Sequence, residues 1–121
     1  MSRQILDENR IHSAVRDQVS NLHADIVKEV QDAVAANAVV VVGMRQNPMP
    51  RYARKVLDND QIKYKYLEYG SYFSGWRRRN ALKMWSGWPT FPMVFVKGVL
   101  VGGAQDLARL HASGELKNLL A

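Results

Sequence analysis

One stretch of nineteen residues decides the fold of this chain: Trp85-Ser86-Gly87-Trp88-Pro89-Thr90-Phe91-Pro92-Met93-Val94-Phe95-Val96-Lys97-Gly98-Val99-Leu100-Val101-Gly102-Gly103. Two short runs rich in β-branched residues, 94–96 and 99–101, flank Lys97-Gly98, which predicts a β-hairpin. Pro92 directly precedes the first run, where a proline starts a strand without removing a ladder donor. A proline turn of this kind is also where cis peptide bonds occur. The stretch therefore predicts a strand pair in the core of a sheet.

Helical and strand-like segments alternate outward from this hairpin. A valine run at 38–42, bounded by Gly43, is typical of a central strand buried on both faces. Asn47 suits a helix cap and Pro48 a first helical position, which predicts a helix over 48–57. Further predicted elements are a strand exposed on one face at 62–68 and helices at 25–36, 76–85, 105–112 and 115–120. In the helix at 76–85, the residues available for burial are Trp76, Ala81, Leu82 and Trp85.

The N-terminal segment adds a helix of its own. Apolar residues recur there at spacings of four, four and three: Ile11, Val15, Val19 and Leu22. These spacings place them on one face of an amphipathic helix from Asn9 onward. Such a stripe requires cover, either from the same domain or from a second copy of the chain in a homodimer. We therefore expect an N-terminal extension over residues 1–24 and a folded domain over residues 25–121.

Charge is distributed unevenly along the 121 residues, which contain 17 basic and 11 acidic side chains for a net charge of +6. Residues 1–37 hold four basic and six acidic residues, a net −2, so residues 38–121 hold thirteen against five, a net +8. The net positive charge of residues 38–121 favours anionic partners such as small carboxylates, phosphates or nucleic acid. The basic residues considered for a nucleic-acid patch are Arg51, Arg54, Lys55 and Arg77 to Arg79. Because three successive helical positions fan over more than half the circumference, at least one of Arg77 to Arg79 should face solvent or an anion.

Several classes of function are excluded by composition. The chain has no cysteine, so its own residues supply no disulfide, thiolate nucleophile or cysteine-ligated iron–sulfur cluster. His12, His23 and His111 are scattered without close ligand partners, so we expect no metal site. There is no run of eighteen apolar residues and no charged-then-apolar leader, so we expect a soluble, cytoplasmic protein without a membrane span.

Several motifs at ordered positions carry a resemblance to a known family. They are Val39 to Val42, Asn47 to Pro50, Ile62-Lys63-Tyr64, Thr90-Phe91-Pro92, Gly102-Gly103 and the tail from Leu107 to Leu116. In this order they resemble a glutaredoxin over roughly residues 25–120, and the run Trp88 to Pro92 is similar to the monothiol Cys-Gly-Phe-Ser branch. The resemblance implies a thioredoxin-like α/β fold: a four-stranded mixed sheet with helices on both faces, here with an extra N-terminal helix.

The chain departs from this family where the chemistry resides. The resemblance places the nucleophilic cysteine at Asn47 and the second cysteine or serine at Pro50. An amide side chain has neither an ionisable proton nor an exchangeable sulfur, so thiol–disulfide exchange and cluster ligation through this position are excluded. No residue of this chain is therefore expected to act as the catalytic thiol.

The resemblance implies that glutathione recognition survives this loss in part, because some of it uses backbone groups. The resemblance implies that the cysteinyl part of glutathione pairs with the backbone of Phe91 before Pro92. Its γ-glutamyl end would meet the amides after Gly102-Gly103 and a side chain nearby. The residues implied for a glutathione or peptide site are Arg45, Asn47, Phe91, Pro92, Gly103, Ala104, Gln105 and Asp106.

Three functions remain open from the sequence. The leading hypothesis is a glutaredoxin-like protein without redox activity that acts as a binding or regulatory module, with glutathione or a protein as its partner. The second is a glutathione-dependent enzyme in which the ligand brings the thiol and Arg45, Asn47 or Tyr52 orients it. The third is a nucleic-acid binder that uses the basic residues named above.

Overall fold

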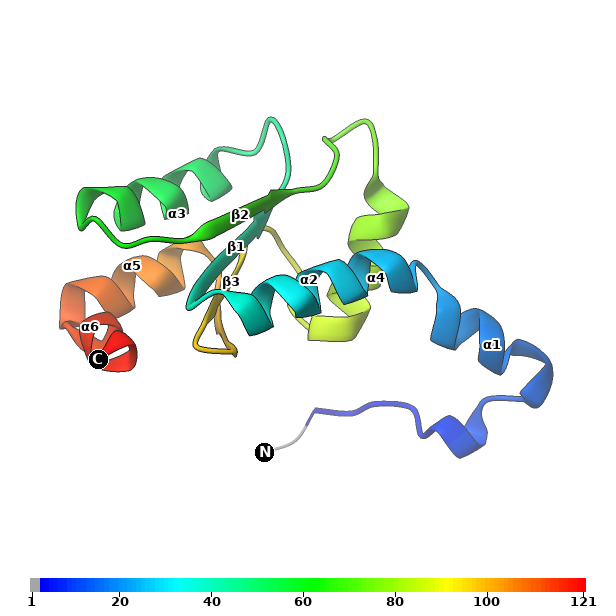
Figure 1. Cartoon of the computed structure of the whole chain (residues 1–121). Helices are drawn as coiled ribbons and strands as arrows, with labels where there is room; N and C mark the ends of the chain where they lie inside the picture. Colours follow the sequence, from blue (N-terminus) through cyan, green and yellow to red (C-terminus); the bar gives the residue numbers. More distant parts are fainter. Residues whose placement is uncertain (1–2) are drawn as a thin grey trace.

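A four-stranded sheet forms the centre of the computed structural model, which describes residues 3–121 (Figure 1). Strand β1 (Val39–Gly43) lies inside the sheet, parallel to β2 (Lys65–Glu68) and antiparallel to β3 (Met93–Val96). The outer strand β4 (Val99–Gly102) pairs with β3 as a hairpin. The strand order β2-β1-β3-β4 confirms the predicted mixed sheet, with the valine run as a central strand.

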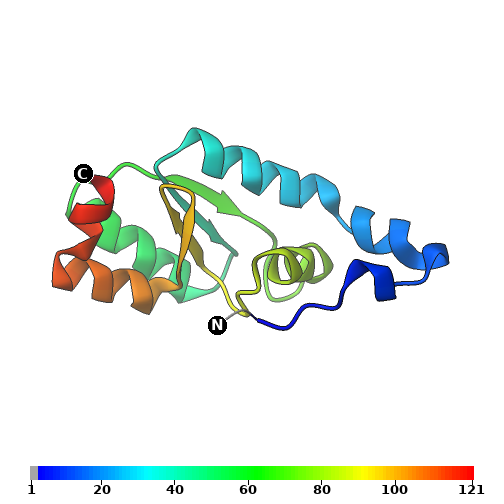
Figure 2. The same cartoon turned by 90° about the horizontal axis from the view of Figure 1, so that it is seen from below.

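Helices cover both faces of this sheet, as predicted (Figures 1 and 2). One face carries α2 (Ala24–Ala36) and α4 (Trp76–Ser86), and the other carries α3 (Pro48–Asn59), α5 (Ala104–Ser113) and α6 (Glu115–Leu120). Successive strand residues point to opposite faces, so β1 contributes to two cores. Val40 and Val42 pack with α2 and α4, whereas Val39 and Val41 pack with α3, α5 and α6.

The hairpin of the opening stretch is present with its expected turn. Lys97 and Gly98 both have positive φ, 52° and 81°, as a two-residue type I′ turn requires. The peptide bond between Phe91 and Pro92 is cis. Pro92 therefore lies directly before β3, and Gly103 lies directly after β4. These two residues lie on the two sides of the site described below.

The N-terminal helix is present but begins later than predicted. Instead of a helix from Asn9, a short 3-10 turn, η1 (Glu8–Arg10), precedes α1 (Ser13–Asn21). His12 causes the delay, because its Nδ1 accepts a hydrogen bond from the Ala14 N–H and so caps a new helix. Residues 1 and 2 of the predicted extension lie outside the described residues.

Two other predictions are wrong in detail. The strand expected at 62–68 begins only at Lys65, because the Ile62 N–H donates to the Leu57 carbonyl and closes the turn after α3. Trp76, expected to be buried, is 54% exposed, because it is the first residue of α4 and the loop before it leaves the ring open to solvent. Arg79, one turn later, is buried instead.

The sequence predicted that the chain has no membrane span. Among residues 3–121, no helix combines the length and the apolar character needed to cross a bilayer. A cytoplasmic location stays a prediction.

Gly43 provides a test of how β1 packs against α3. A Cβ at this position would lie 2.7 Å from Pro50 Cβ and 2.9 Å from the Tyr66 hydroxyl oxygen. We expect Gly43→Ala to lower the free energy of unfolding by about 1–3 kcal/mol through overpacking. Urea denaturation followed by tryptophan fluorescence measures this, with exposed Val99→Ala as the control expected to cost under about 1 kcal/mol. Equal stability of Gly43→Ala and the wild type would contradict this packing.

Candidate functional site

A groove of about 520 Å³ lies where the start of α3, the turn before β3, the start of α5 and one face of α4 meet. Each of these segments ends or begins at the same edge of the sheet, so residues distant in sequence come together there. The groove is lined by Met44, Asn47, Met49, Tyr72, Arg79, Lys83, Trp88, Pro89, Thr90, Phe91, Pro92, Gly103, Ala104, Gln105 and Asp106. Seven of the eight residues predicted for a glutathione or peptide site are in this set.

Asn47 holds two sides of the groove together. Its Oδ1 accepts a hydrogen bond of 3.0 Å from the Met49 N–H, which makes it the predicted cap of α3. Its Nδ2 donates to the Phe91 carbonyl oxygen at 3.2 Å, a contact across 44 residues of sequence. Both polar ends of the amide are therefore engaged within the protein.

The turn before β3 presents backbone to the groove. The side chains of Phe91 and Pro92 are buried, and Phe91 is only 6% exposed. The Phe91 carbonyl oxygen accepts from Asn47, while among residues 3–121 no acceptor takes the Phe91 N–H. An extended ligand therefore meets one free donor and one partly used acceptor at this residue.

The opposite side of the groove is the N-terminus of α5. The Gly103 N–H donates to Asp106 Oδ2 at 2.9 Å, and Arg109 donates to Asp106 Oδ1 at 2.8 Å. The hydrogen bond from Gly103, with that from Arg109, holds the pKa of the Asp106 carboxyl below its usual range. Asp106 thus caps its own helix. The amides of Ala104 and Gln105, in the first turn, have no partner within the helix and favour an anion.

Two basic side chains of α4 reach the groove and were not assigned to it from the sequence. Arg79 is 6% exposed and donates through one terminal nitrogen to the carbonyl oxygens of Tyr69 and Ser74, at 3.0 and 2.7 Å. Burial lowers the pKa of its guanidinium. Lys83, one turn further, places Nζ 5.9 Å from the centre of the Phe91 ring. Among residues 3–121, no ion pair joins Arg79 or Lys83 to a carboxylate.

Arg45 is the predicted site residue that the groove does not include. Its side chain is exposed, and its backbone N–H donates to the Gly70 carbonyl oxygen. Met44, its neighbour, lines the groove instead and is 7% exposed. The structure therefore supplies the positive charge of the groove from α4 rather than from Arg45.

An ordered aromatic loop borders the groove. Tyr72, which lines it, is 58% exposed, and Phe73 is 88% exposed. The loop is nevertheless held by hydrogen bonds between Ser71 and Ser74 and by the bond from Arg79 to the Ser74 carbonyl. Arg79 therefore helps to hold the backbone of a loop that exposes two aromatic side chains to solvent, and such side chains are suited to contact with another molecule.

Comparison with known proteins defines the class. A thioredoxin-like sheet with a cis-proline turn facing the N-terminus of α3 is the arrangement of the thiol oxidoreductase fold, and the glutaredoxin family model matches residues 39–101. A glutaredoxin-like protein from Dictyostelium discoideum is 46% identical over 100 residues, covering 83% of this chain and 81% of the relative. This chain belongs to the glutaredoxin family, and it is a member whose sequence contains no cysteine.

Solved structures agree with this assignment. Oxidised glutaredoxin 2 from Chlamydomonas reinhardtii superimposes with a TM-score of 0.70 at 30% identity, covering 81% of this chain and 92% of that protein. A buckwheat glutaredoxin solved in complex with glutathione gives a TM-score of 0.71 at 23% identity, covering 83% and 91%. The predicted thioredoxin-like fold of the glutaredoxin type is confirmed.

The double role of Asn47 predicts graded stability effects. Asn47→Ala removes the helix cap and the bond to the Phe91 carbonyl, so we expect a loss of about 2 kcal/mol in the free energy of unfolding. Asn47→Ser keeps a capping oxygen and loses only the second bond, so we expect about half that loss. Urea denaturation of the three proteins checks the order. Equal stability of the two variants would show that the helix cap contributes nothing, and an Asn47→Ser variant as stable as the wild type would show the same of the contact with Phe91.

Proposed function

We propose that this protein is a redox-inactive binding module of the glutaredoxin family, whose groove takes glutathione or an extended peptide without reacting with it. One observation carries the proposal: a groove is lined by Asn47, the residue that the resemblance to glutaredoxins places at the position of the nucleophile. Binding then leaves the ligand chemically unchanged. The protein would then act by binding its ligand, as a regulatory or scaffolding protein does.

The charges of the groove suit a ligand with two carboxylates, such as glutathione. The free amides at the start of α5 favour one carboxylate, since the helix dipole adds to their hydrogen bonds. Arg79 and Lys83, across the groove and without a carboxylate partner of their own within residues 3–121, favour the other. The Phe91 N–H, at another lining residue of the groove, has no acceptor within residues 3–121 and could pair with the ligand backbone. The glutathione bound in the buckwheat structure makes this tripeptide the first ligand to test.

A peptide longer than glutathione is favoured by the aromatic loop. Tyr72 lines the groove, and Phe73, the next residue in the loop, is exposed to solvent. Aromatic side chains of this kind give much of the binding energy at protein interfaces. An acidic extended segment of a protein partner, passing Phe91 and then Tyr72, would use both the charge and the aromatic surface.

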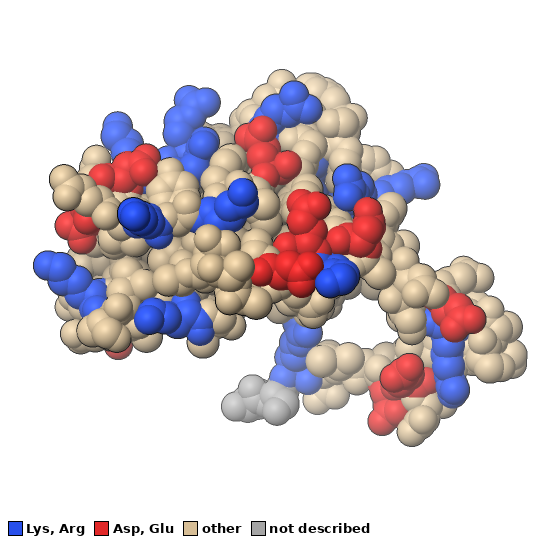
Figure 3. Space-filling model, in the orientation of Figure 1, with Lys and Arg blue, Asp and Glu red and all other residues tan. Residues whose placement is uncertain are grey.

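The two alternative functions find less support in the geometry. A glutathione-dependent enzyme would need a side chain to orient the thiol of the ligand, but both polar ends of Asn47 are engaged with Met49 and Phe91. A nucleic-acid patch would need its basic residues together, yet α3 and α4 cover opposite faces of the sheet. Figure 3 shows acidic and basic side chains interspersed on the face that it presents.

Calorimetry with reduced glutathione tests the proposal. We expect a single site, weakened about tenfold by Lys83→Ala because a charge-assisted contact is lost, and weakened also by Pro92→Ala. Lys55→Ala, which removes an exposed positive charge from α3, is the matched control and should bind as the wild type does. No heat at about millimolar glutathione, where a weak site would still be detected, would exclude glutathione as the ligand.

Restoring the family nucleophile gives a second test. In Asn47→Cys the new thiol would stand at the N-terminus of α3, where the helix dipole lowers its pKa and makes it nucleophilic. We expect this variant to gain glutathione-dependent reduction of a small glutathione mixed disulfide, with Asn47→Ser inactive. A variant that folds, as judged by circular dichroism, but stays inactive would contradict an intact groove.

A further inference from the structure

The N-terminal arm, defined as residues 3–23, leaves its apolar stripe open. None of the residues of α1 is buried. Val15, Val19 and Leu22 are 42%, 49% and 43% exposed, although their spacing on one face is typical of a packed helix. Figures 1 and 2 show α1 projecting beyond α2 and α4, and Figure 3 shows an opening between the arm and the body. The body of the protein therefore does not provide the cover that this stripe requires.

The accessible surface supports the same conclusion. The chain exposes 8109 Å², whereas a compact monomer of 13.7 kDa exposes about 6,600 Å². The difference is about 1,500 Å², and a standard protein–protein interface buries about 800 Å² on each partner. The excess is thus large enough for a stable interface that includes the arm.

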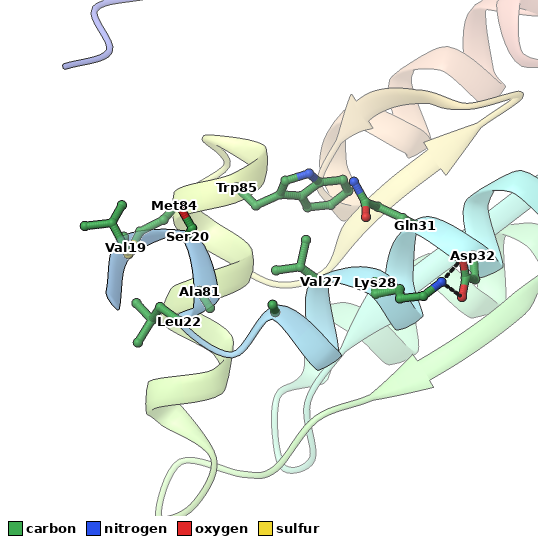
Figure 4. A pocket seen from close by; sticks show the side chains of 11 residues that line it. Val19, Ser20, Leu22, Val27, Lys28, Gln31, Asp32, Ala81, Met84 and Trp85 are labelled. Atoms are coloured by element: carbon green, nitrogen blue, oxygen red, sulfur yellow. Dashed lines mark hydrogen bonds and ion pairs between the residues drawn. The ribbon is translucent and has the colours of Figure 1, made fainter. Parts of the chain in front are cut away.

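An apolar groove lies directly beside the arm. It has a volume of about 650 Å³ and runs between the end of α1, the start of α2 and the end of α4. Its apolar wall includes Val19, Leu22, Val27, Met84 and Trp85 (Figure 4). The Met84 side chain is 61% exposed, so this wall is open to another molecule.

We infer that this face binds a second copy of the same chain, as a two-fold symmetric dimer. Val19 on α1 and Leu22, which directly follows α1, belong both to the apolar stripe of the arm and to the wall of the groove. A two-fold axis lets the stripe of each protomer enter the groove of its partner, since the same patch is used twice. At the rim, Lys28 and Asp32 form an ion pair of 3.1 Å, so the rim has no excess of either sign that would select an oppositely charged partner. The dimer places residues 3–24 of the predicted extension at an interface apart from the glutathione or peptide groove.

Analytical ultracentrifugation of the full chain tests this dimer. At about 100 µM we expect a mass of about 27 kDa, twice that of one chain. Val19→Asp places a charge at the centre of the interface and should weaken the dimer by about tenfold or more. Val99→Asp, at a similarly exposed position of the hairpin, is the matched control and should leave the mass unchanged.

Met84→Glu provides an independent variant, because it alters the wall from α4 rather than from the arm. It should weaken the dimer as Val19→Asp does, and circular dichroism confirms that each variant remains folded. A wild-type mass of about 14 kDa at this concentration overturns the inference. A dimer that survives both substitutions overturns it as well, since the interface then lies elsewhere.

Discussion

The amide of Asn47 is the constraint on which the groove depends. It caps α3 through Met49 and bonds the Phe91 carbonyl, so one side chain fixes the distance between a helix start and the turn before β3. A bond of this kind contributes about 1 kcal/mol, but its position gives it a further consequence. At the position where the resemblance to glutaredoxins implies the nucleophile, this chain has a side chain that forms hydrogen bonds with both sides of the groove.

The other groups of the groove that could bind a ligand do not depend on the residue at position 47. The Phe91 N–H and the first amides of α5 are backbone groups, so no particular side chain is needed to keep them. Arg79 holds the aromatic loop through two carbonyl oxygens and thereby brings a buried cation to the groove. The ligand recognition that we propose would therefore use groups of the groove that do not include a thiol.

Local patterns predicted the fold well, because the sheet is built from short segments that have strong signals of their own. The valine run, the Lys97-Gly98 turn and the Asn47 cap were all assigned from neighbouring residues. Contacts between distant segments were not. The bond from Asn47 to Phe91 spans 44 residues, and the choice of Arg79 as the buried member of three arginines depends on the loop that it anchors.

Arg45 is the one predicted site residue that does not line the groove. Met44 lines the groove and is buried, whereas Arg45 lies in the turn that follows β1 and has an exposed side chain. Trp76 failed as a core residue because apolar spacing identifies a helical face but not how far the body extends along it. The order of the motifs predicted most of the residues that line the groove. That Arg79 and Lys83 also line it depends on how α4 packs, which the sequence does not show.

The central claim is that the groove binds without a thiol, and titration of the ¹⁵N-labelled protein with reduced glutathione tests it most directly. The amide resonances of Phe91, Gly103 and Ala104 should shift together with one saturating curve, while those of the arm stay in place. Shifts scattered over the surface without saturation, or none at the three groove amides, would contradict the account.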